Sequence, residues 1–327
     1  MNLVTGGAGF IGTHLVNILL GMDKPVRVLE RPGADTRHLP LDRIEVVFAD
    51  IRDQQAVNNA MKDCEYVYHL AADPNLWRKQ PEEFDAINFR GTLNVLESAL
   101  QNGAKRVMHT STESILTTSD FNGSGVEFLE LKEEHMIGPY CLSKYRADKS
   151  ALDLGKQGEP VIVVTPTLPV GPGDRNLTPH TRMALAFCRG ELPAILECCL
   201  NLIDVRDVAM GMVLAMEKGR PGVRYLLGSE NHRLSDWLGI LGRYANRPAP
   251  ELRVPYTLAL AVAWFSEQWA RYITDNMPMA TLTGVKLTRR SMFFDASKTL
   301  EELGLEPRPV EQSAKDTVDW FRIEKLI

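Results

Sequence analysis

The 327-residue sequence has few cysteines and no excess of basic residues. Its five cysteines include the adjacent Cys198 and Cys199 but no C-x-x-C pair. This pattern argues against a disulfide scaffold and indicates reduced thiols in a cytosol-like compartment. With 37 Lys and Arg against 42 Asp and Glu, the formal net charge is −5. The chain therefore lacks the electrostatic footprint of a nucleic-acid-binding protein.

Long hydrophobic runs are also missing. No apolar stretch reaches the ~18–20 residues that span a bilayer, and the nearest candidate, residues 258–265, is too short. The chain starts with MNLVTGGAGF, which is typical of a strand and a turn and leaves no room for a signal peptide. The seven histidines are scattered and form no H-x-x-x-H or acid cluster, so no metal site is predicted. We therefore expect a cytoplasmic protein.

The hydrophobic patterns divide the chain into two parts. Residues 1–165 alternate short β-rich runs with helical patterns, which predicts a doubly wound parallel sheet of the Rossmann type (fold class α/β) that binds NAD(P). From residue 166 the pattern loosens, and we expect 166–327 to form mainly a smaller substrate-binding lobe, with some segments returning to the sheet. The expected strands are 2–5, 26–30, 45–49, 66–70, 106–111, 161–165 and 225–227. The expected helices are 12–20, 54–62, 84–101, 140–154, 181–189, 205–218 and 258–273.

A glycine-rich loop follows the first expected strand and opens the first helix. In the run TGGAGFIG, Gly6 permits a tight turn, Gly9 lets the backbone approach a pyrophosphate, and Gly12 lets the helix pack on the strand. The phosphates would lie on the free N–H groups at the helix start, where Phe10 and Ile11 stand. Because the strand, loop, helix and next strand occur in the required order, the run predicts a dinucleotide-binding site.

The ends of the following strands supply further candidates for the cofactor site. Glu30 ends the second strand and can accept bonds from the adenosine ribose, which favours NAD. Arg31 or Arg37 could instead pair with the 2′-phosphate of NADP. Asp50 and Ile51 follow the third strand, where Asp50 can meet the adenine edge or cap the next helix. The fourth strand ends in two small residues, Ala71 and Ala72, which leave room for the cofactor.

A candidate catalytic set lies further along the chain. Tyr140 and Lys144 are four residues apart at the start of an expected helix, so their side chains share one face. A neighbouring ammonium lowers the pKa of a phenol, and the lysine can also bond the nicotinamide ribose. The hydroxyls of Thr110, Ser111 and Thr112 end the fifth strand and can hold a substrate oxygen beside the phenol. The set predicts proton transfer at a carbinol or carbonyl oxygen, coupled to hydride transfer with the nicotinamide.

On these motifs the chain resembles the extended short-chain dehydrogenases/reductases, the NAD-dependent epimerase/dehydratase family. Within it, the chain is similar to a branch that includes hopanoid-associated sugar epimerases, dihydroflavonol reductases and 3β-hydroxysteroid dehydrogenases. The resemblance covers nearly the whole chain. The motifs that carry it are TGGAGFIG at 5–12, HLAAD at 69–73, NFRGTLNVLESA at 88–99, HTSTES at 109–114, PYCLSK at 139–144, PTLPVGPGD at 166–174 and NLIDVRDVA at 201–209.

The resemblance implies roles for individual residues. Thr112 takes the place of the catalytic Ser/Thr, Tyr140 is the acid/base and Lys144 orients the cofactor ribose. It also implies a homodimer that pairs helices 84–101 and 140–154 of the two copies. Four further residues are expected to line the cofactor, mostly on its nicotinamide side: Asn88, Thr110, Pro166 and Thr167.

Three residues are expected near the substrate. Trp77 follows the fourth strand, where it can roof the pocket or pack in the core. Glu113 follows Thr112 where dehydratases carry an acid, although a solvated or salt-bridged glutamate is favoured over a catalytic one. Asn176 lies in the loop 175–180, which is expected to border the pocket.

One position departs from the nucleotide-sugar relatives. Where they carry an arginine that clamps the substrate pyrophosphate, this chain has Leu200, and a leucine cannot neutralise a diphosphate. We therefore expect an NAD(P)-dependent oxidoreductase that interconverts a secondary alcohol and a ketone on a bulky apolar small molecule. A sterol or hopanoid is the favoured substrate, with decarboxylation as a further step on a suitable carboxylate. The alternatives are a sugar epimerase or dehydratase that retains NAD, and a cofactor-binding sensor without turnover.

The segment 258–273 is rich in aromatic residues. It carries Trp264, Phe265, Trp269 and Tyr272 at helical spacing. Packing inside the small lobe is the favoured interpretation. An apolar lid or a face that rests on a membrane is the alternative, and it is disfavoured because the segment itself is not rich in Lys or Arg.

Overall fold

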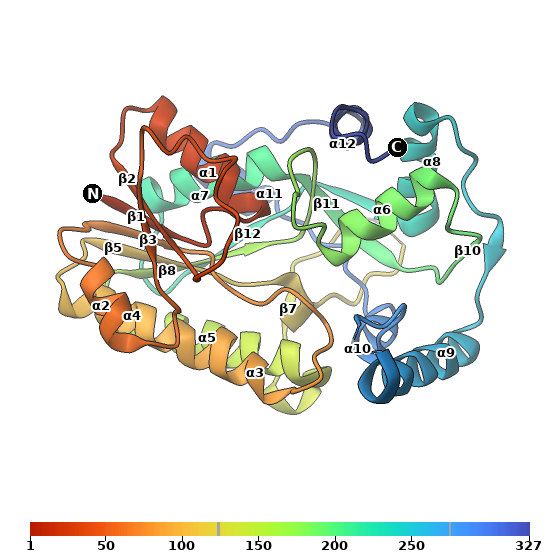
Figure 1. Cartoon of the computed structure of the whole chain (residues 1–327), viewed down its shortest axis with the longest axis horizontal. Coiled ribbons are helices and arrows are strands. Elements are labelled where there is room, and N and C mark those ends of the chain that lie inside the picture. Colours follow the sequence, from red (N-terminus) through yellow and green to blue (C-terminus); the bar gives the residue numbers. More distant parts are fainter. Residues whose placement is uncertain (123–124, 275) are drawn as a thin grey trace.

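The computed structural model describes residues 1–122, 125–274 and 276–327, and it is built around a seven-stranded parallel sheet (Figure 1). The strand order is β12-β8-β5-β4-β1-β2-β3, so the chain reverses its direction of winding between β1 and β4. The predicted doubly wound parallel sheet is confirmed. The strands are β1 (Asn2–Thr5), β2 (Val26–Glu30), β3 (Glu45–Phe48), β4 (Tyr66–His69), β5 (Arg106–Thr110), β8 (Val161–Pro166) and β12 (Arg224–Leu227).

Helices cover both faces of this sheet (Figure 1). One apolar cluster lies between the sheet and α1, α7 and α11, and a second lies between the sheet and α2, α4 and α5. Such two-sided cover is the reason that the central strands read as continuous apolar runs. The helices are α1 (Phe10–Gly21), α2 (Gln54–Ala60), α3 (Glu82–Phe84), α4 (Gly91–Gln101), α5 (Gly138–Lys156), α7 (Val205–Lys218) and α11 (Ser297–Leu303).

The second half of the chain contributes directly to the central sheet. Helix α7 packs against α1, and β12 pairs with β8 as the seventh strand. A buried ion pair joins β12 to the helix on the opposite face, because both terminal nitrogens of Arg224 donate to Asp148 of α5 at 2.6 and 2.7 Å. Residues 205–227 therefore help to build the central sheet and the cover of one of its faces.

The expected helix 84–101 is interrupted. A π-helical turn at Asp85–Arg90 separates α3 from α4. At its end, Gly91 approaches Ile51 so closely that a Cβ atom would lie 2.8 Å from the Ile51 side chain. Single π-turns inside helices are frequent at functional sites, and this one contains Asn88.

The small lobe is built on a three-stranded sheet, β13-β11-β9. Helices α6, α8 and α12 pack around it over a third apolar cluster. The elements of the lobe are β9 (Leu168–Val170), α6 (Pro179–Arg189), β10 (Ala194–Ile195), β11 (Cys199–Asp204), β13 (Glu230–Arg233), α8 (Leu234–Ala245), β14 (Leu252–Arg253), α9 (Tyr256–Trp269), a π-turn (Ala270–Thr274), α10 (Leu282–Leu287) and α12 (Val310–Ile323).

Short elements complete the chain. A small antiparallel pair follows β5, and two 3-10 turns flank it. Across the described ranges we find no helix whose length and hydropathy would carry it through a bilayer. The short elements are β6 (Leu116–Thr117), β7 (Leu129–Glu130) and the turns Glu113–Ile115 and Glu133–His135.

Candidate active site

The glycine-rich loop is shaped by two contacts that exclude any side chain. A Cβ at Gly12 would lie 2.2 Å from the carbonyl oxygen of Gly6, and one at Gly6 would lie 2.9 Å from the Ala71 nitrogen. Gly6 also has φ of +71°, a conformation that favours glycine. The loop therefore seats the start of α1 tightly over β1 and β4, as the spacing predicted.

The start of α1 has the properties of an anion-binding end. Gly9 is its N-cap, and no described side chain caps the first-turn N–H groups. A Cβ at Gly9 would meet only the Gly6 carbonyl, at 3.1 Å, within the described structure. The side chain of Phe10 is buried edge-on against His14, with ring centroids 6.3 Å apart, and Ile11 packs against the core. Phe10 and Ile11 are thus left to offer their backbone N–H groups.

Glu30 lies at the end of β2 and connects this strand to the loop. Its Oε1 atom accepts a hydrogen bond from the Ala8 N–H at 2.7 Å. Burial raises the pKa of Glu30, and backbone hydrogen bonds from Ala8 and Arg31 oppose the shift. The carboxyl group therefore supports the loop as well as standing where the adenosine ribose is expected. Of the two arginines considered for a 2′-phosphate, Arg37 pairs with Asp35 at 2.7 Å, whereas Arg31 is exposed next to Glu30.

The predicted adenine-side residues need one correction. Asp50 does not cap α2, because the N-cap is Asp53, whose side chain accepts from the Ala56 N–H at 3.0 Å. Asp50 instead pairs with Arg52 at 2.6 Å, which keeps the pKa of Asp50 below its usual range. Asp50 and Asp53 are both acidic residues just before the helix, and the sequence alone does not show which of the two caps it. Three further residues are expected to contact the cofactor. Ile51 is buried, Ala71 is half-buried and Ala72 is exposed.

Unpartnered hydroxyls at the end of β5 fit a bound dinucleotide. The side-chain oxygens of Thr110 and Ser111 are buried and find no hydrogen-bond partner among the described residues. Both stand at the carboxyl edge of the parallel strands, near the reversal between β1 and β4, where ligands bind in open α/β sheets. Buried polar atoms without partners are costly, so a ligand that offered hydrogen bonds to these two hydroxyls would be stabilised here.

Tyr140 lies in the first turn of α5 and faces Thr112. The Thr112 side chain lies close enough to the phenol to affect its pKa, and the Thr112 Oγ1 atom lies 3.1 Å from the Ser114 hydroxyl. Phe84 packs edge-on against the Tyr140 ring, with centroids 6.1 Å apart. The ring is thus held by a hydroxyl on one side and an aromatic edge on the other, in a fixed position for proton transfer.

The pKa of the Tyr140 phenol is raised, whereas we expected it to be lowered. Burial raises the pKa of Tyr140, and the nearby Cys141, Asp73 and Glu113 add to the rise, while the neighbouring Thr112 side chain opposes it. A neighbouring lysine was expected to lower this pKa, but the Lys144 ammonium donates to the Thr110 carbonyl at 2.7 Å. The phenol is therefore protonated at neutral pH, and this form can donate a proton to a carbonyl oxygen.

Lys144 is buried in an environment that disfavours its charge. Burial lowers the pKa of Lys144 to about 8, and Asp148 opposes the shift. Beneath it, the rings of His69 and His109 lie 5.7 Å apart, and burial together with the Lys144 charge lowers the pKa of His69 to about 3. The Lys144 ammonium thus lies near two buried histidines, and a hydrogen bond to a ribose hydroxyl would stabilise its charge.

Both polar atoms of the Asn88 side chain are hydrogen-bonded to other protein groups. Its Oδ1 accepts from the Asp73 N–H at 2.7 Å, and its Nδ2 donates to the Asp73 carbonyl and, at 3.4 Å, to Ser143. It therefore ties the π-turn to α5 and to the loop after β4. The sequence reasoning missed Asp73, whose buried carboxylate pairs with Arg78 and anchors that same loop.

Trp77 is buried in the anchored loop. Its indole N–H has no hydrogen-bond partner within the described ranges, which leaves a donor available to a ligand.

Pro166 and Thr167 lie buried at the end of β8, where the Thr167 hydroxyl donates to the Leu227 carbonyl at 3.2 Å. Asn176 is exposed between β9 and α6, and its contact with a substrate stays a prediction.

Glu113 places a carboxyl group beside Thr112 and Tyr140. One of its oxygens, Oε2, is fully buried and has no hydrogen-bond partner in the described part of the chain. Burial raises the pKa of Glu113 to about 8. One carboxyl oxygen is thus shielded among the described residues, and whether Glu113 is a solvated or salt-bridged glutamate or a catalytic acid stays a prediction. The carboxyl group is available as a proton donor near neutral pH.

We predict that Glu113→Gln stabilises the protein in a pH-dependent way. A raised folded-state pKa means that the wild type loses stability as pH rises from the unfolded value of 4.5 toward about 8, whereas the amide does not titrate. The variant should match the wild type below that window and exceed it above, by on the order of 2 kcal/mol after allowance for partial exposure. Urea unfolding at both ends of the window measures the difference. Glu127→Gln, a change at an exposed side chain, is the control, and identical pH profiles for wild type and Glu113→Gln would contradict the assignment.

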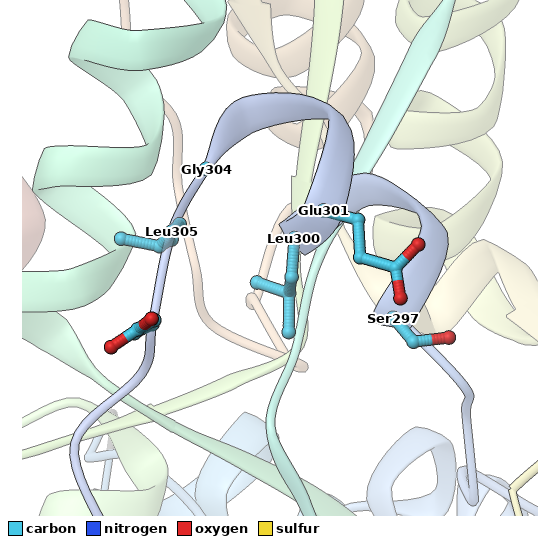
Figure 2. A pocket seen from close by; sticks show the side chains of 6 residues that line it. Ser297, Leu300, Glu301, Gly304 and Leu305 are labelled. Carbon is cyan, nitrogen blue, oxygen red and sulfur yellow. The ribbon is translucent and has the colours of Figure 1, made fainter.

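A separate surface hollow lies beside α11 (Figure 2). Its lining includes the carboxylates of Glu301 and Glu306 together with Leu300 and Leu305. Two acidic groups would repel the phosphates of a dinucleotide, so this hollow is not the cofactor site. In the residues that the structure describes, no group of three or more His, Cys, Asp or Glu side chains is arranged to hold a metal ion.

Comparison with known proteins places this site in a family. The model of the NAD dependent epimerase/dehydratase family matches residues 2–228. A putative dihydroflavonol 4-reductase of Synechocystis sp. is 36% identical over 323 residues, which are 98% of this chain and 94% of that protein. Sterol demethylase protein B of Methylococcus capsulatus is 28% identical over 99% of both chains. The crystal structure of gox2253 superposes with a TM-score of 0.87 at 33% identity, covering 100% of this chain and 99% of that one. Together with the glycine loop and the Thr112, Tyr140 and Lys144 set, these matches confirm the resemblance: the chain belongs to the NAD dependent epimerase/dehydratase family and is an NAD-dependent enzyme of the extended short-chain dehydrogenase/reductase type.

Proposed function

We propose that the protein interconverts a secondary alcohol and a ketone on a bulky, largely apolar small molecule, with a sterol or hopanoid as the favoured substrate. The observation that carries this proposal is the environment of Leu200. Its side chain is buried in β11 within the apolar cluster of the small lobe, which also contains Leu202 and Trp237. Where nucleotide-sugar relatives carry an arginine, this position offers no counter-charge to a diphosphate.

The relatives support an apolar substrate class. Sterol demethylase protein B of Methylococcus capsulatus matches the chain from end to end, and its name assigns that protein to sterol chemistry.

The site residues divide the proposed chemistry among them. Bound NAD would supply the hydride acceptor or donor at its nicotinamide ring. Thr112 holds the substrate oxygen, and the Tyr140 phenol donates a proton to it when a ketone is reduced. For oxidation of an alcohol, Tyr140 must first lose its proton, because only the phenolate can take the proton of the carbinol. Lys144 bonds the nicotinamide ribose, and the loop at Gly6 to Gly12 holds the pyrophosphate.

A carboxylate on the substrate would add a further step. If the carbon next to the carbinol carried a carboxylate, oxidation would give a β-keto acid. That acid loses CO₂ as its C–C bond breaks, and the electron pair of this bond forms an enolate that takes up a proton. No further oxidant is needed, because the hydride has already moved to NAD.

The redox balance tests the proposed function. Purified protein is incubated with NAD or NADP and a panel of sterols, hopanoids and nucleotide sugars, and absorbance at the nicotinamide band is followed. We expect net NADH formation, equal to the ketone formed, with a polycyclic alcohol. Turnover of a nucleotide sugar with retained NAD and no net absorbance change would overturn the proposal in favour of an epimerase or dehydratase. No turnover of any compound would favour a sensor.

One observation favours the dehydratase as the second candidate. Glu113 presents a buried, unpartnered carboxyl oxygen, in the described structure, at the position where dehydratases carry their acid. A homodimer through α4 and α5 stays a prediction of the family resemblance, and a cytoplasmic location stays a prediction of the composition.

A further inference from the structure

Helix α9 and the π-turn after it bury small residues and expose large ones. Ala259, Ala263 and Ala270 lie buried on one side of this segment. The opposite side presents large apolar side chains to solvent, which reverses the pattern of an ordinary surface helix. We call these side chains the aromatic face; they are Trp264, Phe265, Trp269, Tyr272 and Ile273.

The aromatic face is contiguous. Residues 265, 269, 272 and 273 recur at the spacing that puts side chains on one side of a helix. The side chains of Phe265, Trp269 and Tyr272 are 66%, 59% and 76% exposed, and Trp264 packs edge-on against Phe265 at 4.8 Å. Our favoured expectation, packing of these aromatics inside the small lobe, is therefore wrong. The lobe is filled on this side by alanines, which let α9 approach α10 closely.

The segment is fixed to the protein by its inner side. The buried Glu267 carboxylate accepts from the Leu282 N–H at 2.7 Å and so joins α9 to α10. Thr283 of α10 in turn packs on Gly138, the first residue of α5, where a Cβ would lie 2.4 Å from the threonine hydroxyl. Figure 1 shows α9 and α10 together at one end of the molecule. The aromatic face is thus the outer surface of a rigid unit whose inner surface touches the catalytic helix.

Charge and residue type identify what this face would contact. Between residues 256 and 290 the sequence has four basic and two acidic residues, although the chain as a whole carries −5. The exposed Lys286 and Arg289 lie on α10 and just after it, so the basic groups come from the neighbouring segment rather than from α9 itself. Trp and Tyr favour the headgroup region of bilayers, and basic side chains attract anionic lipids.

We propose that the aromatic face docks the protein on the surface of a bilayer that contains anionic lipids, without spanning it. A second copy of the chain is the competing occupant. A two-fold contact through this face would bring the same basic segment of both copies together, which is unfavourable. An anionic headgroup layer has the complementary charge.

Docking would also place the active site close to the lipid. Leu76 lies against α10, where a Cβ at Gly284 would be 3.4 Å away, and the next residue is Trp77 of the candidate substrate site. The loop that carries Trp77 therefore adjoins the helix pair that carries the aromatic face. This link rests on the proposed function, whereas docking itself does not.

Tryptophan fluorescence gives a direct test, because the five tryptophans divide into two sets. Trp77, Trp237 and Trp320 are buried, while Trp264 and Trp269 are exposed on the aromatic face. Full-length protein is mixed with vesicles of phosphatidylcholine and phosphatidylglycerol, or of phosphatidylcholine alone, with no substrate present. We expect a blue shift of emission and co-sedimentation with the mixed vesicles, both weakened by salt.

Two matched variants assign the effect to the face. Phe265→Glu should reduce co-sedimentation by about tenfold or more, because it puts a carboxylate into the interface. Ile323→Glu changes a similarly exposed apolar residue on α12 and should leave binding unchanged. Thermal melting checks that both variants are folded. No shift with mixed vesicles would overturn the proposal. A change of Phe265→Glu from dimer to monomer, without any effect on vesicles, would show that a second copy occupies the face. Because no substrate enters this assay, a failure here is separate from a failure of the proposed function.

Discussion

Tyr140→Phe is expected to lower turnover by about 10³-fold, because the variant keeps the ring but has no proton to exchange with the substrate oxygen. The edge contact with Phe84 does not involve the hydroxyl, so the ring should stay in place. Lys144 keeps its bond to the Thr110 carbonyl, and NAD affinity should therefore change little. Turnover is measured with the substrate found in the redox screen, and NAD binding by calorimetry.

A second tyrosine serves as the control for Tyr140→Phe. The Tyr244 hydroxyl donates to Glu311 at 3.0 Å on the surface of the small lobe, so Tyr244→Phe removes a bonded phenol outside the cleft. It should leave turnover unchanged. If Tyr140→Phe lost NAD binding in parallel with activity, the residue would belong to the cofactor site rather than to proton transfer. Unchanged turnover would remove it from the mechanism.

Gly12→Ala is the second change with a large expected effect. The added methyl group would lie 2.2 Å from the Gly6 carbonyl oxygen and 2.8 Å from the Gly7 Cα, both backbone atoms that cannot rotate away. The loop must move from the start of α1, and strain of this kind typically costs about 1–3 kcal/mol. We expect NAD affinity to fall by about a hundredfold, together with a lower melting temperature.

The same helix provides the control for Gly12→Ala. Gly21 ends α1, and no described atom lies within 4 Å of a Cβ built there. Gly21→Ala should bind NAD normally and melt slightly higher, since alanine is the better helix former. Wild-type affinity in Gly12→Ala would mean that the loop does not hold the dinucleotide.

Features set by local sequence could be predicted, and those set by distant contacts could not. Tyr140 and Lys144 are close in sequence, and so are the glycines of the loop. The structure places Tyr140 and Lys144 on one helix, and the glycine loop at the start of α1, as predicted. The π-turn around Asn88 was missed, because it depends on bonds to Asp73 and Ser143. No pattern in the sequence distinguishes such a turn from regular helix.

Electrostatics and burial were harder to predict for the same reason. The rise in the pKa of Tyr140 comes from burial by several elements, which the four-residue spacing does not contain. Trp269 points outward because the alanines of α9 pack against α10 on the opposite side of the helix. This contact joins two helices, so the pattern within α9 alone does not predict it.

The late arrival of α7 and β12 has a consequence for synthesis. One face of the N-terminal sheet depends on α7, and Asp148 has its buried partner, Arg224, on β12. Until α7 has been made, the nascent chain lacks the helix that covers the apolar side of α1, and β8 has no partner on one edge until β12 follows. The apolar surface of the N-terminal sheet is therefore fully covered only after residue 227 has been added.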